Sequence, residues 1–393
     1  MWDWASLLFL VLGLLGFLAG LASLLQGWRF SAQVGRAAAY PEKGTPAVAI
    51  LAPVRGLDPG LAVNLDGLLT QRYGRYRVVF AVDSMNDPAV AVIQAAIVRH
   101  PIPAGIVVSP GPRGGSGKSA ALARAAEELT EEDRVVVTWD ADARPHERWL
   151  ATLVGGLGEG VGATTGYRWY SSRGGFWSAV RAGWVASGYN ILFSDRYNFC
   201  WGGSTAVGRD LFDSERIREK WPSSLSDDLV ITFAVKEKGL KVRFLPRAVC
   251  VTEEPCDRRT CLEWTTQQAA IVYAYFPKLT SYALGAYAVF DGAVILGILA
   301  AILSVAVAPE FAAAAALLLL DLPLTVVKAE QRRRALARVL PEWREMFTAE
   351  RAQYLTASLL IPWVMVLNLR RVRRLATLTW RGRTYPLPVT SRR

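Results

Sequence analysis

The sequence predicts a domain of the α/β class with a mostly parallel sheet, joined to apolar helices at a membrane. Apolar runs typical of strands alternate with helical patterns between about Ala47 and Pro246. Hydrophobic residues make up 52% of the 393 residues, and the mean hydropathy of +0.22 is high for a soluble protein. These apolar residues also gather in long, nearly uncharged runs toward the two ends of the chain. A chain of this length can hold one large domain together with a membrane region.

The alternating segment predicts four strand–helix pairs. Near-continuous apolar strands that alternate with helices are typical of a parallel sheet covered on both faces. Ligands of such sheets bind beyond the carboxyl ends of the strands, and polar loops follow the strands there. The predicted strands are Ala47–Ala52, Tyr76–Val82, Gly105–Val108 and Val135–Trp139, and the helices that follow them are Pro59–Thr70, Pro88–Arg99, Lys118–Leu129 and Pro145–Leu157.

Four apolar runs predict an integral membrane protein. The first, Leu7 to Leu25, is long enough to span a bilayer, and we interpret it as an anchor. A signal peptide is the alternative, but the chain begins with Trp2-Asp3-Trp4 instead of a basic region, and no clear cleavage site follows. Tyr282–Ala308 and Phe311–Val327 are two further spans. The shorter run Tyr354–Leu369 is broken by a proline, so it could span the membrane or be re-entrant.

These patterns divide the chain into a series of expected parts. Tyr273, Tyr275 and Phe276 suit an amphipathic helix in the membrane interface, because aromatic rings favour the depth of the headgroups. The expected parts are an anchor (1–28), the α/β domain (45–266), an interfacial amphipathic helix (267–281), a C-terminal membrane region (282–369) and a basic tail (370–393).

The net charge of +11 is concentrated beside the apolar runs. Arg29 and Arg36 follow the first run, and a basic cluster from Lys328 to Arg338 follows the third. By the positive-inside rule, both segments and the domain between them lie in the cytoplasm, at a bacterial-type inner or plasma membrane. If the fourth run spans, the arginines between 370 and 374 lie outside; otherwise they could face anionic headgroups. Basic residues beside apolar spans favour the lipid bilayer as the partner, and we predict no nucleic-acid binding.

Two aspartates follow the last predicted strand. Asp140 and Asp142 are separated by one residue, so their side chains can point the same way from an extended segment. Two like charges in one place repel unless a cation lies between them, and Mg²⁺ or Mn²⁺ takes one or two carboxylates plus phosphate oxygens. The pair therefore suggests a site for a metal ion and a diphosphate. The alternative is a solvated turn, because most isolated D-x-D pairs lie in such turns.

The cysteines carry little functional information. Cys200, Cys250, Cys256 and Cys261 show no C-x-x-C spacing, and the only histidines, His100 and His146, are distant in the sequence. A zinc site is therefore a weak alternative to reduced cytoplasmic thiols.

A glycine-rich segment, Gly111 to Ser119, resembles a phosphate-binding loop. A Walker A loop needs glycine five positions before Gly117, and that position is Pro112. The mismatch disfavours an NTPase. Lys118 could still reach a nucleotide or diphosphate, or it could be a solvated lysine at the start of a helix.

Taken together, these motifs resemble those of the family 2 inverting glycosyltransferases, and more closely their ceramide glucosyltransferase branch. The segment from Pro53 to Leu65 resembles the branch's opening P-x-x-G-x-D-P-x-L-x-x-N-L. Asp83 with Asp87-Pro88-Ala89 resembles its first aspartate region, and Asp140-Ala141-Asp142 its metal-binding D-x-D. Ser226-Asp227-Asp228 resembles the segment that carries the catalytic base. The order of the motifs along the chain makes the set specific.

The resemblance extends over roughly Ala47 to Pro277 and implies a catalytic domain of the GT-A type. It also implies a UDP-sugar donor, Mg²⁺ or Mn²⁺ as cofactor, and a membrane lipid as acceptor. Glucose is the first candidate for the sugar. Ceramide, diacylglycerol or a hopanoid is the candidate for the lipid, and the product would be a β-glycolipid.

The same resemblance assigns roles to individual residues. Asp140 and Asp142 would hold the metal ion, and Asp228 would remove the proton of the acceptor hydroxyl. Asp227 is the competing candidate for the base, and the acidic pair could also be a helix N-cap. Asp83 would accept hydrogen bonds from the nucleobase or ribose. The expected donor-binding residues are Pro53, Arg55, Asp83, Lys118, Asp140, Gly202 and Gly203.

One departure from the family pattern affects how the leaving group is held. The family usually carries Q/R-x-x-R-W after the base, and here the best-placed segment ends in Gln267-Gln268. Glutamine offers neutral hydrogen bonds where arginine would offer a fixed charge. Trp264, just before this pair, could supply the aromatic surface, or it could be an interfacial tryptophan.

The acceptor-binding region is expected in the aromatic segment from Gly174 to Phe193. This segment could lie in the membrane interface and admit a lipid, or it could be a buried core helix. Two alternative functions stay open. A processive polysaccharide synthase would need more spans and an intact Q-x-x-R-W, and a non-enzymatic membrane scaffold would not need the aspartates.

Overall fold

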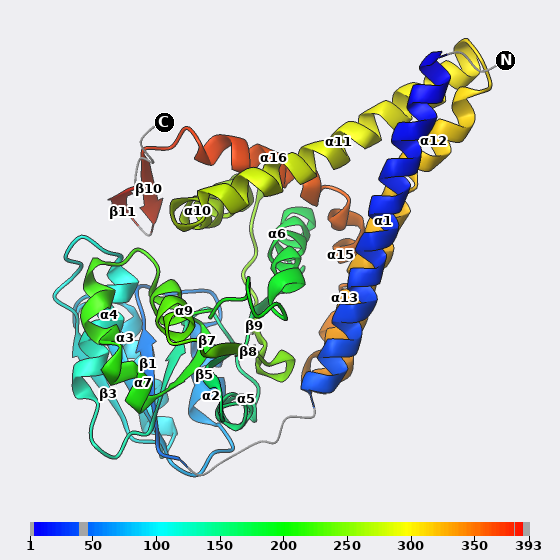
Figure 1. The fold of residues 1–393 in the computed structure, drawn as a ribbon. Helices are drawn as coiled ribbons and strands as arrows, with labels where there is room; N and C mark the ends of the chain where they lie inside the picture. The colour runs from blue at the N-terminus through cyan, green and yellow to red at the C-terminus, as the bar shows by residue number, and fades with distance from the viewer. Residues whose placement is uncertain (1–3, 39–45, 381, 388–393) are drawn as a thin grey trace.

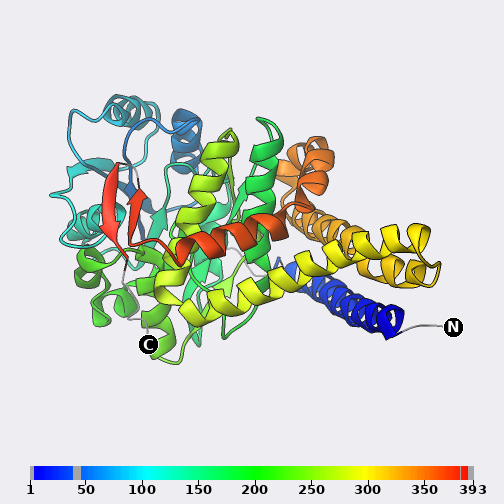
Figure 2. The ribbon, with the colours of Figure 1, turned by 90° about the horizontal axis from the view of Figure 1, so that it is seen from above.

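The computed structural model describes residues 4–38, 46–380 and 382–387. An α/β domain forms one part of the molecule, and long helices extend away from it (Figure 1). Figure 2 shows the same arrangement from above, with the C-terminal helix α16 (Ile361–Val372) crossing over the α/β domain between the long helices and the C-terminal hairpin.

A seven-stranded sheet forms the centre of the α/β domain, in the order β3-β2-β1-β4-β7-β5-β8. Strands β3, β2, β1 and β4 run parallel to one another, β7 is antiparallel to both of its neighbours, and β5 pairs with β8 in parallel. The strands are β1 (Val48–Pro53), β2 (Tyr76–Val82), β3 (Ala104–Val108), β4 (Val135–Trp139), β5 (Val161–Thr165), β7 (Ser204–Gly208) and β8 (Lys241–Phe244).

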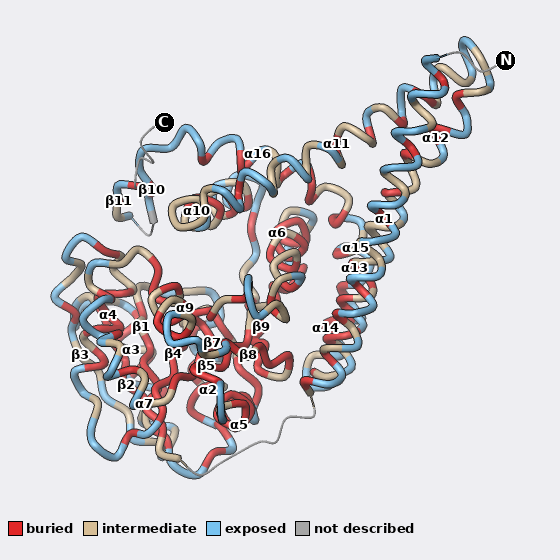
Figure 3. Tube along the Cα trace, viewed as in Figure 1, coloured by how far each residue is buried: buried red, intermediate tan, exposed pale blue. Residues whose placement is uncertain are grey.

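Helices cover both faces of the sheet, as the apolar strands predicted. On β1, Ile50 packs into one core cluster with Leu65 of α2, and Leu51 packs into the opposite cluster with Leu122 of α4. Figure 3 shows the strands buried between these two layers. The first layer is formed by α2 (Leu61–Leu69), α3 (Ala89–Arg99) and α5 (Trp149–Gly155), and the second by α4 (Gly117–Ala125), α7 (Arg209–Ser214), α8 (Ile217–Lys220) and α9 (Asp227–Glu237).

Two small sheets lie outside the central one. Strand β6 (Arg168–Tyr170), which follows β5 along the chain, pairs in parallel with β9 (Cys250–Thr252), which follows β8. Near the C-terminus, β10 (Thr377–Trp380) and β11 (Arg383–Pro386) form an antiparallel hairpin. The tail expected as a simple basic segment therefore contains regular structure.

Three helices in the described part of the chain are long and apolar enough to cross a membrane. They are α1 (Trp4–Ala37), α11 (Pro277–Ala306), and α12 (Phe311–Leu319) taken together with α13 (Asp321–Val339). Figure 3 shows much of α1 and α11 exposed, which suits helices that contact lipid. The predicted membrane helices are confirmed at these three places.

The first helix extends past the expected anchor boundary at residue 28. Phe30 and Val34 are buried near its end, and Phe30 packs edge-on against Tyr189 with ring centroids 6.0 Å apart. On the facing helix α13, Arg332 donates to Asn190 Oδ1 at 2.9 Å. Arg332 of the basic cluster therefore joins helix α13 to the α/β domain.

The fourth apolar run forms two helices, α15 (Arg351–Ser358) and α16 (Ile361–Val372), bent by 56° at their junction. Such a bend suits either a broken span or a re-entrant segment. A short helix, α14 (Arg344–Ala349), precedes them.

The interval expected as one interfacial helix, 267–281, is divided between two helices. Helix α10 runs from Arg258 to Tyr275, and α11 begins at Pro277. The division follows from the proline, because it lacks the N–H that a helix interior needs and fits a first helical turn. Helix α6 (Phe176–Ala186) lies beneath α10 and α16, and most of its residues are buried. The segment from Gly174 to Phe193 thus contains the buried helix that was the alternative to an exposed lipid entrance.

Candidate active site

The two aspartates of the D-x-D lie on the loop that follows β4, at the carboxyl end of the parallel strands. The buried Trp139 ends the strand, and its indole Nε1 donates to Ala143 O at 2.8 Å. Asn64 of α2 donates from Nδ2 to Ala141 O, also at 2.8 Å. These two bonds fix the loop from either side, so that the intervening carboxylates project from a rigid turn.

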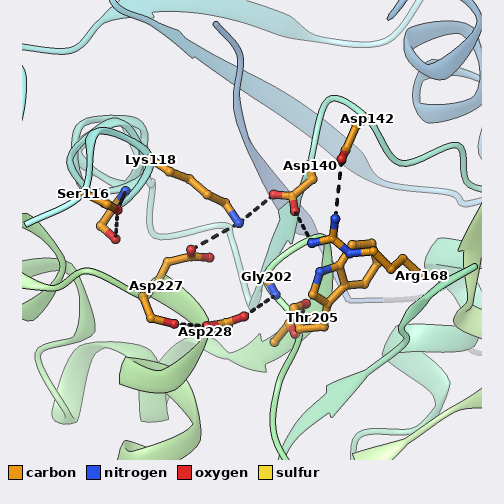
Figure 4. Close-up of polar contacts among 12 residues, drawn as sticks. Ser116, Lys118, Asp140, Asp142, Arg168, Gly202, Thr205, Asp227 and Asp228 are labelled. Carbon is orange, nitrogen blue, oxygen red and sulfur yellow. Dashed lines mark hydrogen bonds and ion pairs between the residues drawn. The ribbon is translucent and has the colours of Figure 1, made fainter. Parts of the chain in front are cut away.

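Lys118 connects the D-x-D to the second acidic pair. Its Nζ lies 2.7 Å from Asp140 Oδ1 and 3.1 Å from Asp227 Oδ1 (Figure 4). Although burial opposes its charge, the carboxylates of Asp140, Asp227 and Asp228 raise the pKa of Lys118. The lysine therefore stays charged at the centre of the site. Ser116 caps the helix that carries it, since its Oγ accepts from Ser119 N at 3.0 Å.

Arg168 of β6 is a central site residue that sequence reasoning missed. Its guanidinium lies 3.6 Å from Asp142 Oδ2 and 4.0 Å from Asp140 Oδ2 (Figure 4). It lies over the Trp201 ring at 4.7 Å and over the Trp264 ring at 5.6 Å. Stacking of this kind holds a guanidinium in one place and adds a cation–π attraction. An arginine directly after a buried strand, within an aromatic segment, was the available signal, and it is weak on its own.

The D-x-D has the ligand chemistry for a divalent cation. Burial raises the pKa of Asp142 to about 6, against the opposing effect of Arg168. A half-buried pair of neighbouring carboxylates favours a cation, and Mg²⁺ binds through one or two carboxylates plus substrate phosphate oxygens. The described residues contain no group of three or more His, Cys, Asp or Glu side chains that could hold a metal without a substrate. Asp140 and Asp142 are the residues that would hold such an ion, together with oxygens of a bound diphosphate.

The acidic pair at the start of α9 separates into two environments. Asp227 is buried, and this burial raises its pKa to about 7 despite the attraction of Lys118. Asp228 is more accessible, and its Oδ1 accepts hydrogen bonds from Ser226 Oγ and, at 2.9 Å, from Leu229 N. Its Oδ2 has only a long contact of 3.4 Å with Gly202 N among the bonds described. Oδ2 is therefore the less strongly hydrogen-bonded oxygen of Asp228 among the described residues.

Glycines 202 and 203 allow the charged groups to approach the backbone closely. A Cβ at Gly202 would overlap Asp227 Oδ2 and Lys118 Nζ, and a Cβ at Gly203 would lie 2.9 Å from Asp140 Oδ2. Any side chain at these positions would displace the cluster. The structure thus places Gly202 and Gly203, both expected as donor-binding residues, beside the charged cluster.

The first loop places Arg55 and Asp83 together. Pro53 ends β1, and the Arg55 Nε lies 3.1 Å from Asp83 Oδ2. Two residues far away in the sequence join them: Arg383 Nη2 lies 3.0 Å from the same Asp83 oxygen, and Tyr385 Oη accepts from Gly117 N at 3.2 Å. Sequence reasoning missed both, because nothing local in the tail indicates a contact 300 residues away.

Trp264, Gln267 and Gln268, from the segment that differs from the family's Q/R-x-x-R-W pattern, have different contacts in the structure. Trp264 lies on α10 against Arg168, and therefore borders the D-x-D. Gln267 donates from Nε2 to Thr379 O at 2.9 Å, so its described bond is with the C-terminal hairpin. The Nε2 of Gln268 is buried and has no hydrogen-bond partner among the described residues. Arg168, not either glutamine, is thus the fixed cation that the structure brings to the aspartates.

All four cysteines are free and buried in the described structure. Cys200 lies beside the site, where its backbone N donates to Thr232 Oγ1 at 2.9 Å. Burial raises the pKa of its thiol to about 12, so the thiol stays protonated and unreactive at neutral pH.

Comparison with known protein families places the chain among the glycosyltransferases. The family model for glycosyl transferase family 21 matches residues 8–389. The chain belongs to family 21. The match includes the membrane helices and the C-terminal hairpin as well as the α/β domain, so the family assignment covers almost the whole molecule.

Curated relatives match this family 21 chain over a short segment. A ceramide glucosyltransferase of Komagataella phaffii is 35% identical over 54 residues, which is 14% of this chain and 11% of the relative. The matches to three such relatives cover between 10% and 13% of their length. The resemblance to the ceramide glucosyltransferase branch is confirmed at this modest level of identity.

Solved structures of glycosyltransferases are also similar to the chain. A mannosyltransferase of Pyrobaculum calidifontis, in complex with GDP-mannose and Mn²⁺, has a TM-score of 0.44 and 20% identity, covering 91% of this chain and 99% of that one. A glucosyl-3-phosphoglycerate synthase of Mycobacterium tuberculosis, in complex with Mn²⁺, UDP-glucose and glycerol 3-phosphate, has a TM-score of 0.34 and 16% identity, covering 61% and 83%. The sheet order confirms the predicted α/β fold class with a mostly parallel sheet.

Proposed function

We propose that this family 21 member transfers a sugar from a UDP-sugar to the hydroxyl group of a membrane lipid. Glucose is the first candidate sugar, and ceramide or a similar lipid such as diacylglycerol or a hopanoid is the acceptor. The observation that carries the proposal is the cluster of Asp140, Lys118, Asp227 and Asp228 at the carboxyl end of the sheet. The ceramide glucosyltransferase relatives and the membrane helices support a lipid acceptor.

The donor's diphosphate is proposed to lie between the D-x-D and Lys118. Asp140 and Asp142 would hold Mg²⁺ or Mn²⁺, which would neutralise charge on the departing diphosphate when bound. Lys118 already contacts Asp140 at 2.7 Å and can turn its ammonium toward a phosphate oxygen. A mobile, charged amine with several donors suits this role, because it keeps its charge among the carboxylates.

Arg168 is proposed to supply the fixed charge that Gln267 and Gln268 cannot. Its guanidinium is stacked between aromatic rings and is 13% exposed, so it is positioned before the donor binds. A preorganised cation aimed at developing negative charge stabilises the transition state without reorganisation. We infer that Arg168 faces the leaving diphosphate from the side opposite Lys118.

Asp228 is proposed as the general base. Its Oδ1 is held by Ser226 and Leu229 N, which leaves Oδ2 to accept the proton of the acceptor hydroxyl. Asp227 is less suited, because it is buried and paired with Lys118. With one carboxylate as base and no covalent intermediate, the acceptor oxygen attacks the face opposite the diphosphate. An α-linked donor would then give a β-glycolipid.

The proposed chemistry has consequences for where the α/β domain lies and where the lipid enters. The α/β domain is proposed to lie in the cytoplasm, where nucleotide sugars are available, at a bacterial-type inner or plasma membrane. The basic residues near the end of α1 and within α13 support this orientation. The α10–α16 layer, which lies between the domain and the membrane helices, would be the route for the lipid.

A donor and lipid screen tests the proposal. Membranes that contain the full-length protein and Mg²⁺ or Mn²⁺ would be incubated with radiolabelled UDP-sugars and extracted lipids, and the lipid phase separated by chromatography. We expect label in a lipid with at least one UDP-sugar. Labelled polymer that resists lipid extraction would indicate a processive synthase, and label in no lipid with any donor would overturn the proposal.

A further inference from the structure

The C-terminal hairpin lies over the nucleoside end of the proposed donor site. Figures 1 and 2 show β10 and β11 over the α/β domain, on the side where α4 begins. The hairpin follows α16 after a short connection, because α16 ends at Val372 and β10 begins at Thr377. A segment that leaves the membrane region thus returns to the first aspartate of the catalytic domain.

Arg383 of β11 brings a second guanidinium to Asp83. Its Nη2 lies 3.0 Å from Asp83 Oδ2, and Arg55 Nε lies 3.1 Å from the same oxygen. All three side chains are partly exposed, at 27% for Arg383, 23% for Asp83 and 38% for Arg55. Two positive groups on one carboxylate leave an excess of positive charge, which suits an anionic ligand.

The Nη1 of Arg383 has no acceptor among the described residues, although the atom is buried. It lies against Gly117, where a Cβ would overlap it. A buried donor without a partner is costly, so an unpaired guanidinium nitrogen beside a ligand-binding aspartate indicates an acceptor that a ligand supplies. The absence of a side chain at Gly117 is what lets the guanidinium lie so close to the start of α4.

The hairpin is held in this place by contacts on both sides. Tyr385 accepts from Gly117 N at 3.2 Å, and Gln267 of α10 donates to Thr379 O at 2.9 Å. Leu378 and Leu387 pack in the same apolar cluster as α10 and α16. This bond also gives Gln267 a role, since Gln267 takes no part in the proposed stabilisation of the leaving group.

We propose that the C-terminal hairpin is a lid on the nucleoside-diphosphate site, and that Arg383 binds the nucleotide through Nη1. This inference rests on the proposed function, since it assumes that the ligand of Asp83 is the donor nucleotide. The ligand chemistry is an oxygen acceptor of a nucleoside diphosphate, on the ribose, the base or a phosphate. Arg383 is then a donor-binding residue supplied by the tail, outside the α/β domain.

UDP binding to the purified full-length protein tests the lid. Dissociation constants would be measured by calorimetry for wild type, Arg383→Gln and Arg374→Gln, a matched control that removes an exposed arginine from the same tail. We expect Arg383→Gln to weaken UDP binding about 10- to 100-fold, as for the loss of a charged hydrogen bond, and Arg374→Gln to leave it unchanged. In turnover assays the donor KM should rise more than kcat falls.

A second measurement needs no variant. Saturating UDP should slow amide hydrogen exchange in Thr377–Trp380 and Arg383–Pro386 of the wild-type protein. Wild-type affinity in Arg383→Gln, or exchange in the hairpin that UDP does not change, would overturn the inference while the proposed function stands. A wild-type protein that binds no UDP would overturn the proposed function, and the lid with it.

Discussion

At the scale of single residues, the site is a set of charges that balance one another. Lys118 lies between Asp140 and Asp227, and Arg168 lies beside both aspartates of the D-x-D. Asp140, Asp142 and Asp227 therefore each have a cation nearby. A donor that carries two phosphates would therefore enter a site where positive groups are already oriented.

Asp228→Asn tests the proposed base. Asparagine keeps the shape and an Oδ1 that can accept from Ser226 and Leu229 N, but it cannot accept the proton, so kcat should fall about 100- to 10,000-fold while UDP still binds. Asp227→Asn is the matched comparison, and it should affect donor binding more than kcat, because Asp227 pairs with Lys118. Steady-state kinetics on both variants would decide between them. A larger loss of kcat in Asp227→Asn would transfer the role of base to Asp227.

Arg168→Gln tests the fixed cation. The change removes the charge that faces the D-x-D, so kcat should fall about 100- to 1,000-fold. Arg144→Gln is the control. Arg144 lies on the loop that carries the D-x-D, but its Nη2 pairs with Glu253 at 2.9 Å and its guanidinium lies over Trp343. Its turnover should stay close to that of wild type. Equal losses of kcat in Arg168→Gln and Arg144→Gln would mean that the position of the Arg168 charge beside the D-x-D does not matter.

The sequence could predict the residues of this site that lie in short motifs. Asp140, Asp142 and Asp228 were recognised because each stands in a local pattern next to a predicted strand or helix. Arg168 and Arg383 could not be recognised in that way. Their roles arise from contacts with residues distant in the chain, which only the packing of β6 and β11 creates.

At the scale of elements, the four strands β1 to β4 were predicted well, because their signal is local, whereas the later strands were not predicted. The bounds of β2 and β4 agree with the apolar runs, Tyr76–Val82 and Val135–Trp139. The helix expected over Lys118–Leu129 ends earlier, at Ala125, and continues as a 3₁₀ turn. The order of the strands beyond β4 could not be predicted, because β7 pairs antiparallel to β4 through contacts between distant segments.

Ser116→Ala tests whether the start of α4 positions Lys118. Removal of the cap should cost about 1 kcal/mol of stability and should also weaken UDP binding. Asp257→Ala removes the corresponding cap of α10, where Oδ1 accepts from Thr260 N at 2.7 Å, and should cost a similar amount without changing UDP affinity. Thermal unfolding and calorimetry on both variants would separate the two effects. Equal UDP affinities in the two variants would contradict a positioning role for α4.

At the scale of the whole molecule, the membrane helices and the α/β domain form one connected body. The end of α1 and the lower part of α13 pack in a shared apolar cluster with Tyr189, and α10 lies between the domain and α16. The position of the apolar runs predicted the helices. Their packing against the catalytic domain could not be predicted, because apolar runs do not specify a partner.

Cysteine labelling tests the proposed orientation of this body in the membrane. The native cysteines are all buried, so an added cysteine would dominate the reaction with an impermeant maleimide. Val307, 71% exposed between α11 and α12, should react as Val307→Cys from outside intact cells, because α11 has crossed the membrane there. Val98→Cys on α3, at a position 87% exposed, should react only after permeabilisation. The reverse pattern would place the catalytic domain outside.

The central claim is that the charged cluster at the sheet edge catalyses an inverting transfer to a lipid. The most direct measurement is the anomeric configuration of the glycolipid that the purified wild-type protein makes from an α-linked UDP-sugar, determined by NMR. The account predicts a β-linked glycolipid, and no such product from Asp228→Asn. An α-linked glycolipid, or a β-linked one that Asp228→Asn makes at the wild-type rate, would contradict it.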